Sequence, residues 1–293
     1  MGAMHGRPDG LLLGRTCLVT GATSGIGRSS ALALGAMGAK LFLLCRNPKR
    51  ADALRAEIAA QTGNRNVEIL LADLASQAEI RRAAAAFLAT GEPLHVLLNN
   101  AGVMQTARSE TVDGIETTFA VNHLAYFLLT NLLLERLVAS APARIVNVAS
   151  DAHKLGGALD FDDLGAARRY SGMAVYGRSK LANLYFTKEL ARRLAGTGVS
   201  VNAAHPGAVR TELGQNNDAP ILKLLTGLVR PFFRSPEKGA QTSIWLCSAA
   251  EVAGVSGKYF ADCKERRPHR LVDDEEAARL LWDASAKLVG LSV

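Results

Sequence analysis

A tyrosine and a lysine, Tyr176 and Lys180, stand four residues apart in a segment whose pattern predicts a helix. Four residues make about one helical turn, so the two side chains share a helix face. A phenol with its ordinary pKa of about 10 is a poor acid–base catalyst at neutral pH. A neighbouring ammonium stabilises the phenolate and lowers that pKa. The pair is a candidate proton donor and acceptor, although two residues at this spacing are a weak signal alone.

Two further polar residues strengthen this hypothesis. Ser150 closes an expected strand, and its hydroxyl can hydrogen-bond the same substrate oxygen; the alternative is a serine that caps the next element. Asn122 lies within Ala-Val-Asn-His-Leu, inside an otherwise apolar expected helix. It can hold a water molecule or a main-chain carbonyl in a proton relay; the alternative is an asparagine that faces solvent. The predicted catalytic residues are Asn122, Ser150, Tyr176 and Lys180.

A glycine-rich segment, TGATSGIG at 20–27, connects an expected strand to an expected helix. Its glycines permit a tight turn and let the backbone approach a pyrophosphate, while the helix N-terminus offers free N–H groups to the anion. With 27 glycines in 293 residues, an ordinary glycine turn is the alternative. The position between strand and helix favours a dinucleotide-binding loop. Its predicted cofactor-binding residues are Gly21, Thr23, Ser24, Gly25, Ile26 and Gly27.

The end of the second expected strand indicates which dinucleotide is preferred. Sites for NAD usually carry an acid there, which binds the ribose 2′-hydroxyl. This chain has Cys45-Arg46, with Lys49 and Arg50 close behind and no acid. An arginine there can pair with a 2′-phosphate, and a solvated surface arginine is the alternative. We therefore expect NADP(H) to be preferred over NAD(H).

Strands and helices alternate along the whole chain. Compact apolar runs predict strands at 16–20, 40–45, 67–71, 96–99, 144–149 and 200–204, with a seventh near 258–260. Helices are expected at 25–37, 48–62, 77–89, 114–139 and 173–194. Short connections between them predict one α/β domain over 1–293, with a doubly wound, Rossmann-like parallel sheet of about seven strands and helices on both faces. The candidate residues all fall at the carboxyl ends of strands or on the following helix, where such sheets bind ligands.

Composition narrows the class of protein. With 48% apolar and 21% charged residues, the chain can bury a core, so disordered and fibrous classes are excluded. The formal charge of +7 is scattered and accompanies no nucleic-acid-binding module, which favours small anionic ligands over nucleic acid. The four cysteines lack metal-type spacing and predict reduced core thiols. No segment has the ~18–20 apolar residues of a membrane span, so we expect a soluble cytoplasmic protein.

Together these motifs resemble the short-chain dehydrogenase/reductase family over nearly the whole chain. Four further stretches, 121–130, 179–183, 204–210 and 256–263, are similar to its retinol dehydrogenase and WW-domain-containing oxidoreductase-like branch, which generally prefers NADP(H). The family motifs appear in the family's order: Thr20–Gly27, Asp73-Leu74, Asn99–Gly102, Asn122, Ser150, Tyr176 with Lys180, and Pro206-Gly207.

The resemblance implies a role for each matching residue. Tyr176 gives or takes the proton, while Lys180 lowers its pKa and holds the nicotinamide ribose. Ser150 orients the substrate carbonyl, and Asn122 completes the proton relay. The implied cofactor contacts are Asp73 and Leu74 at the adenine, Asn99, Ala101 and Gly102 near the adenosine ribose, and Pro206, Gly207, Val209 and Thr211 along the nicotinamide.

Two features depart from the resemblance. Many retinol dehydrogenases carry an apolar N-terminal anchor that this sequence lacks, which bears on membrane residence and retinoid turnover. Ala149 precedes Ser150 where the family often has a second serine, a change that we expect to matter little.

The segment 221–234 is apolar with interspersed cations. In the family this region forms a substrate lid, at about 211–237 here, and its character suits a lipophilic substrate. A helix packed on the core and docking on an anionic membrane surface are the other interpretations.

The function implied by these residues is NADP(H)-dependent interconversion of a lipophilic aldehyde or ketone, a retinal-like one included, and the alcohol. The alternatives are a non-catalytic NADP(H)-binding regulatory protein of the same fold and a nucleic-acid-associated basic protein. By analogy with the family, the helices at 114–139 and 173–194 are candidates for a homodimer interface.

Overall fold

Eight strands form one sheet in the computed structural model, which describes residues 11–209 and 233–292. Their order is β3-β2-β1-β4-β5-β6-β7-β8, and every neighbouring pair is parallel except β7 with β8. The chain runs outward from β1 to β3 and then crosses to β4, so a ligand crevice is expected where β1 and β4 end. The strands are β1 (Thr16–Thr20), β2 (Lys40–Cys45), β3 (Val67–Leu71), β4 (Val96–Asn99), β5 (Ala143–Val148), β6 (Val199–His205), β7 (Tyr259–Ala261) and β8 (Lys264–Glu265).

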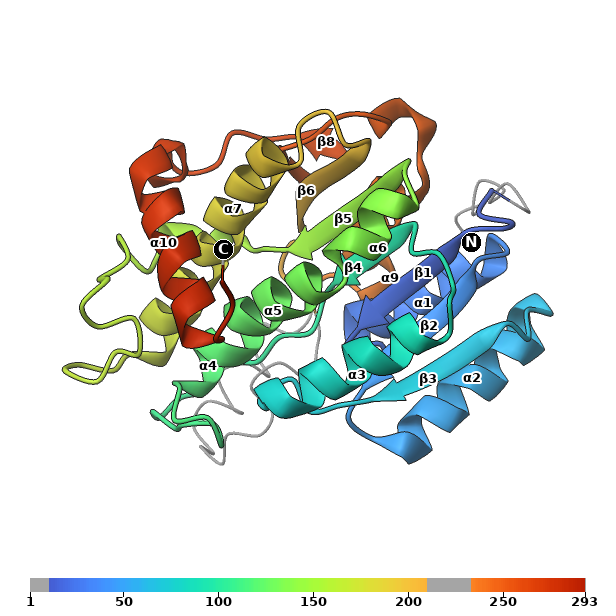
Figure 1. Cartoon of the computed structure of the whole chain (residues 1–293), viewed down its shortest axis with the longest axis horizontal. Coiled ribbons are helices and arrows are strands. Elements are labelled where there is room, and N and C mark those ends of the chain that lie inside the picture. The colour runs from blue at the N-terminus through green and yellow to red at the C-terminus, as the bar shows by residue number, and fades with distance from the viewer. Residues whose placement is uncertain (1–10, 210–232, 293) are drawn as a thin grey trace.

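Apolar side chains of the central strands divide between the two faces of the sheet, because successive residues of a strand point to opposite sides. Leu18 and Leu97 belong to one buried cluster, while their neighbours Val19 and Leu98 belong to the other. Figure 1 shows the helices that cover both faces. The first cluster is covered by α3 (Gln77–Ala89), α5 (Ala125–Leu132), α7 (Gly172–Arg193) and α10 (Glu275–Leu288), the second by α1 (Gly25–Ala36), α2 (Pro48–Thr62) and α9 (Pro236–Ser248).

This architecture confirms the doubly wound parallel sheet expected from the sequence. The seven expected strands each coincide with an observed strand to within one residue at both ends, and β8 adds a short antiparallel edge. The helices α9 and α10 were not among the expected elements, although Ser235-Pro236 and Asp274 are ordinary helix-start signals.

The prediction of a single helix over 114–139 is wrong. The chain instead forms α4 (Thr117–Phe119), a π-helical turn η1 (Ala120–Leu124), α5 and α6 (Leu134–Ala139). The first turn begins only at Thr117 because the buried Glu116 carboxylate accepts hydrogen bonds from the Thr118 and Phe119 amides, at 2.9 and 2.6 Å. Hydrophobic period alone does not reveal such a side-chain cap or an inserted π turn.

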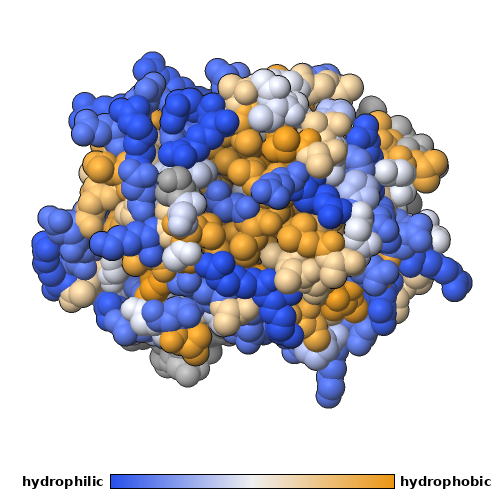
Figure 2. Space-filling view, viewed as in Figure 1, coloured by the Kyte–Doolittle hydropathy of each residue, from blue (hydrophilic) through white to orange (hydrophobic). Residues whose placement is uncertain are grey.

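The C-terminal helix α10 packs on α7 and also contacts α5. It therefore covers part of the surface that the expected homodimer would use, and the homodimer stays a prediction. Figure 2 shows that apolar residues still gather on this side of the molecule over α5 and α6, with hydrophilic residues around them.

The state of the cysteines and the character of the helices bear on two expectations from the sequence. The four cysteines are free, and Cys17, Cys45 and Cys247 are buried, which agrees with reduced core thiols. Within 11–209 and 233–292, none of the helices has the length and apolar character needed to cross a membrane.

The anchor of α10 is Trp282, which generates a stability prediction. Its ring lies 4.9 Å from the Phe127 ring centroid, and the Arg193 guanidinium carbon is 4.0 Å from the Trp282 centroid. Trp282→Ala should lower the free energy of unfolding in urea by about 3–5 kcal/mol, since it leaves a cavity between α10, α5 and α7. The control Leu280→Ala, on the exposed side of the same helix, should change it by less than about 0.5 kcal/mol. Equal losses would show that α10 is not held by Trp282.

Candidate active site

The glycine loop after β1 is held against the loop after β4. Gly21 has a φ of +62°, and a Cβ there would lie 2.8 Å from the Cα of Ala101. A Cβ on Gly27 would lie 2.2 Å from the Gly21 carbonyl oxygen. These two contacts require glycine and bring the start of α1 to the carboxyl edge of the sheet.

The amide of Asn100 ties the two loops together. Its Nδ2 donates to the Thr20 carbonyl oxygen at 2.9 Å, while Thr20 Oγ1 accepts from the Asn100 and Ala101 amides at 2.8 and 3.0 Å. The side chain of Asn99 is instead fully buried between the sheet and α5, where it donates to Thr130 Oγ1 and Asn147 Oδ1. Only the main chain of Asn99 is left to serve the predicted cofactor contact. Asn100, which the sequence prediction missed, holds the loop.

The start of α1 is suited to an anion. Ser24 is the N-cap residue but makes no side-chain cap hydrogen bond, and the first turn carries no acidic residue. The first amides of the helix therefore keep their N–H groups and positive dipole end available. Thr23, Ser24 and Ile26 are partly exposed around this position, as a phosphate-binding loop requires.

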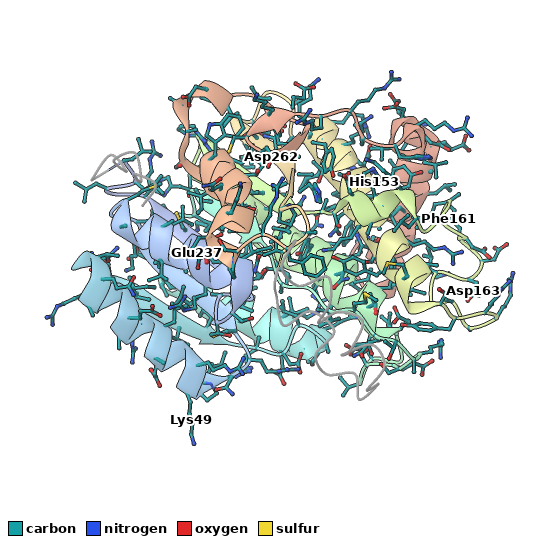
Figure 3. All side chains as sticks on the ribbon, turned by 180° about the vertical axis from the view of Figure 1, so that it is seen from behind. Lys49, His153, Phe161, Asp163, Glu237 and Asp262 are labelled. Atoms are coloured by element: carbon teal, nitrogen blue, oxygen red, sulfur yellow. The ribbon has the colours of Figure 1, made fainter. Side chains whose placement is uncertain are left out.

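Arg46 follows β2, with 71% of its side chain exposed. Its Nη1 lies 3.5 Å from Oδ2 of Asp73, which follows the neighbouring strand β3. Asp73 is fixed in turn, because its Oδ1 accepts from the Ala75 amide and its own amide donates to Glu79. Figure 3 shows Lys49 pointing away from the body of the protein, so it does not join this pair. Arg46 thus has an acidic partner on the neighbouring strand's loop while most of its side chain stays exposed.

Asn122 is completely buried in the π turn η1. Its Oδ1 accepts from the Val103 amide at 2.7 Å, and its Nδ2 donates to the Val103 carbonyl at 2.9 Å and to Ser179 Oγ at 3.0 Å. The solvent-facing alternative is therefore wrong. Asn122 holds a main-chain carbonyl and links the loop after β4 to α7.

Ser150 combines the two roles that the sequence left open. Its Oγ accepts from the Ala152 amide at 3.2 Å, which caps the short 3₁₀ helix η2 (Asp151–Lys154). Burial raises the pKa of Tyr176 to about 12, and the Ser150 hydroxyl beside the phenol partly offsets this rise.

Lys180 is buried beside Tyr176, with 3% of its surface exposed. Its Nζ donates to the Val148 carbonyl at the end of β5 at 3.0 Å and lies 5.6 Å from the Tyr176 ring centroid. Burial lowers the pKa of Lys180 to about 7. In the chain by itself, burial therefore disfavours the charged forms of both Tyr176 and Lys180. The lowering of the Tyr176 pKa expected from Lys180 together with an oxidised nicotinamide stays a prediction.

The loop after β6 forms the remaining side of the crevice. Gly207 has a φ of +80°, and a Cβ there would lie 2.8 Å from Arg234 Nε. Val209 pairs with Arg234 as an isolated bridge, and Arg234 forms an ion pair with Asp262. Pro206 and Gly207 thus follow β6 at the expected edge. Thr211, and the predicted lid as far as residue 232, lie outside the described residues.

The predicted catalytic residues therefore meet in one place, and a further residue joins them. The Tyr126 hydroxyl donates to the Ala101 carbonyl at 2.7 Å, and its ring centroid lies 5.9 Å from Lys180 Nζ. A Cβ on Gly102 would lie 3.4 Å from Asn122 Oδ1 and 3.7 Å from Lys180 Nζ, at ordinary contact distance, so the loop after β4 lies directly beside both side chains. Tyr126 stands four residues after Asn122, a helical spacing that was a usable signal.

Comparisons with known proteins place this geometry in a family. Residues 15–221 match the family model of short chain dehydrogenases. Human retinol dehydrogenase 13 is 47% identical over 95% of this chain and 85% of its own length; human retinol dehydrogenase 14 is 48% identical over 98% and 90%.

Solved structures agree with these sequence matches. An uncharacterized protein from Mycobacterium paratuberculosis has a TM-score of 0.78 and 31% identity, covering 96% of this chain and 95% of that one. RhlG of Pseudomonas aeruginosa, in a complex with NADP, has a TM-score of 0.69 and 29% identity, covering 88% and 98%. This chain belongs to the short-chain dehydrogenase/reductase family, in its retinol dehydrogenase branch.

Proposed function

We propose that this chain is an NADP(H)-dependent oxidoreductase that interconverts a lipophilic aldehyde or ketone and the corresponding alcohol. The observation that carries the proposal is the meeting of Ser150, Tyr176 and Lys180 beside the glycine loop. Two hydroxyl donors and one buried amine at the carboxyl edge suit a reaction in which a carbonyl oxygen gains negative charge.

The chain offers contacts for each part of the dinucleotide. The uncapped start of α1 suits the pyrophosphate, and Arg46 suits a 2′-phosphate. The nicotinamide end of the cofactor would lie beside Lys180 and the loop at Pro206 and Gly207. The bound cofactor supplies the hydride and, when oxidised, a positive charge beside the phenol. The presence of NADP in the RhlG complex supports this assignment.

Proton transfer is the task of Tyr176. With a pKa raised to about 12, the phenol is protonated at neutral pH and can donate to the carbonyl oxygen during reduction. Ser150 already uses its Oγ as an acceptor for the Ala152 amide, so its hydrogen is the group it has to donate. Oxidation of the alcohol needs the phenolate, which burial disfavours.

Asn122 and Lys180 act on the surroundings of Tyr176 and Ser150 rather than on the substrate directly. Asn122 fixes the Val103 main chain beside Lys180, and the Lys180 amine is held to β5 by the Val148 carbonyl. The phenolate that remains when Tyr176 gives up its proton is stabilised by an ammonium at Lys180, because the two opposite charges attract each other strongly away from water.

A lipophilic substrate is supported by exposed apolar side chains that lie near Ser150 and Tyr176 in the chain. Leu155, five residues after Ser150, is 64% exposed, and Met173, three residues before Tyr176, is 48% exposed. The apolar segment 221–234 adds the same character in sequence. The two human relatives named above are retinol dehydrogenases. A cytoplasmic location is part of the proposal and is supported by the free cysteines.

A panel of aliphatic, aromatic and polyene aldehydes with NADPH tests the proposal. Hydride transfer to at least one should depend on Tyr176: Tyr176→Phe should lower kcat by ~10²–10⁴ with the NADPH Kd unchanged, because only the proton donor is lost. The control Tyr185→Phe alters another buried tyrosine of α7 and should keep wild-type kcat. If Tyr176→Phe keeps a tenth of wild-type kcat where chemistry limits the rate, Tyr176 is not the donor. NADPH binding without turnover of any carbonyl would favour the regulatory alternative.

Cofactor preference is tested by Arg46→Ala. We expect the Kd of NADPH to rise about tenfold or more, with little change for NADH, since only NADPH carries the 2′-phosphate that the guanidinium can pair with. The control Arg55→Ala removes an exposed arginine of α2 that is paired with Asp52 and should change neither Kd. Equal wild-type affinities for the two cofactors would refute the preference.

A further inference from the structure

The ring of His153 is buried between the catalytic serine and a distant part of the chain. Its Nδ1 lies 2.7 Å from the Ser150 carbonyl oxygen, and its Nε2 lies 3.0 Å from the main-chain amide of His269. The ring is fully buried, and Figure 3 labels it beside the start of α7. One side chain thus connects Ser150 to a residue more than a hundred positions later.

These two hydrogen bonds define the state of the ring. A carbonyl oxygen only accepts, so Nδ1 carries the hydrogen; an amide N–H only donates, so Nε2 carries the lone pair. A single form satisfies both partners, the neutral Nδ1–H tautomer. Burial lowers the pKa of His153, which keeps that neutral form at physiological pH.

The Ser150 carbonyl oxygen is bound twice by His153. It accepts both the His153 ring Nδ1 and the His153 amide, the latter at 3.1 Å. The Ser150 hydroxyl, on the same residue, must stay aligned with the Tyr176 phenol. A rotation of the peptide after Ser150 would break the ring contact and move η2, which begins at the next residue.

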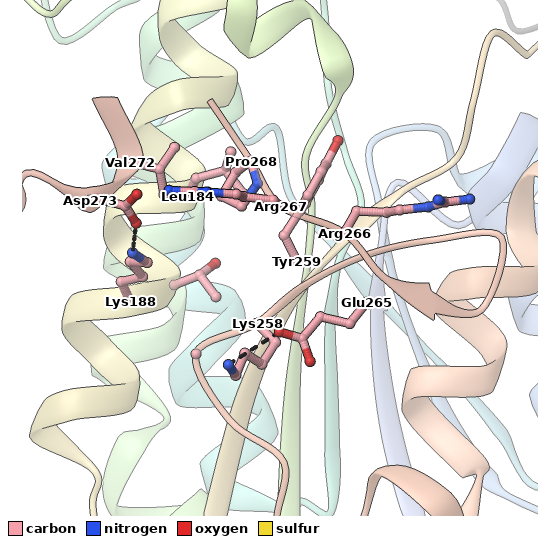
Figure 4. Close-up of a pocket in the computed structure, with 12 residues that line it drawn as sticks. Leu184, Lys188, Lys258, Tyr259, Glu265, Arg266, Arg267, Pro268, Val272 and Asp273 are labelled. Atoms are coloured by element: carbon pink, nitrogen blue, oxygen red, sulfur yellow. Dashed lines mark hydrogen bonds and ion pairs between the residues drawn. The ribbon is translucent and has the colours of Figure 1, made fainter. Parts of the chain in front are cut away.

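A second contact comes from the same distant segment. The Tyr259 hydroxyl donates to Asp151 Oδ1 at 3.0 Å, and the Tyr259 and His153 rings meet edge to face, 5.5 Å apart. Tyr259 and Pro268 also line a cavity of about 550 Å³ beside α7 (Figure 4). Because this cavity leaves one side of the 266–268 segment unpacked, the His269–His153 hydrogen bond matters more for its position.

We propose that His153 is a positioning residue: it fixes the Ser150 carbonyl through Nδ1–H and thereby keeps the Ser150 hydroxyl on the reacting oxygen and on Tyr176. The C-terminal segment 259–269 takes part in the active site through this ring, although it supplies no group to the reaction. The inference rests on the proposed carbonyl reduction.

Two conservative variants separate the two hydrogen bonds of the ring. In His153→Asn the amide nitrogen takes the place of Nδ1 and can still donate to the Ser150 carbonyl. In His153→Gln the amide reaches the place of Nε2 and can only meet the His269 amide. We expect His153→Asn to keep kcat for aldehyde reduction within about threefold, and His153→Gln to lose about ten- to a hundredfold, the scale of a small misplacement of a catalytic group. The NADPH Kd should stay within twofold in both.

A double-mutant cycle with Ser150→Ala shows whether His153 acts through the serine. Once the Ser150 hydroxyl is absent, His153→Gln should cost little further kcat, whereas independent effects would multiply. The matched control is His95→Gln, which alters a histidine that accepts the Thr16 amide at the opposite end of the sheet. It should leave kcat unchanged. Equal kcat in the Asn and Gln variants, or multiplied losses in the cycle, would overturn the inference.

A readout independent of turnover keeps this test apart from the proposed function. Nitrogen-15 NMR of labelled histidine at pH 7 should show His153 as the Nδ1–H tautomer in wild type, and an Nε2–H or charged ring would refute the inference. A wild type with the expected tautomer but no activity on any carbonyl would refute the proposed function and, with it, the role assigned to Ser150.

Discussion

The burial of the Lys180 amine is the constraint on which the rest of the site depends. An amine that is almost completely removed from water favours its neutral form, and burial lowers its pKa to about 7. In the described chain no carboxylate pairs with Lys180; its acceptor is the carbonyl of Val148. Its charge therefore depends strongly on which charges lie beside it. The neighbour that the helix α7 provides, one turn earlier, is Tyr176.

The fold creates this dry site by bringing four strand ends to one edge. β1 contributes the glycine loop, β4 the Asn100–Gly102 loop, β5 the Val148 carbonyl and Ser150, and β6 the turn at Gly207. The contacts between these loops are so close that glycine is required at positions 21 and 27. Asn122 and Tyr126 then lock the β4 loop to the helices behind it. Together these contacts exclude water around Lys180.

Local patterns predicted most of this arrangement. The strands were found because apolar runs of a parallel sheet are compact, and Tyr176 with Lys180 because a spacing of four is a helical turn. The features that the sequence did not reveal depend on contacts between residues far apart in the chain. Asp73 meets Arg46 only because β2 and β3 are neighbours, and His153 meets His269 only in the folded chain. The sequence shows the lysine near Tyr176 but not the burial of both groups, so the opposing effect of burial on the pKa of Tyr176 was missed. The sequence also does not show that the Asn99 side chain is buried against α5 while Asn100 ties the two loops together, so the Asn99 cofactor contact stays a prediction for its main chain.

The pH dependence of alcohol oxidation in wild type and Lys180→Met tests most directly whether Lys180 makes Tyr176 competent. Oxidation needs the phenolate, so log kcat should rise with pH through the titration of the Tyr176–Lys180 pair. In wild type with saturating NADP⁺ and alcohol, we expect the midpoint below the ~10 of a free tyrosine. Lys180→Met keeps the length of the side chain but removes the ammonium, and should raise that midpoint by about one to two pH units. An unchanged midpoint in Lys180→Met, under conditions where hydride transfer limits the rate, would contradict the account.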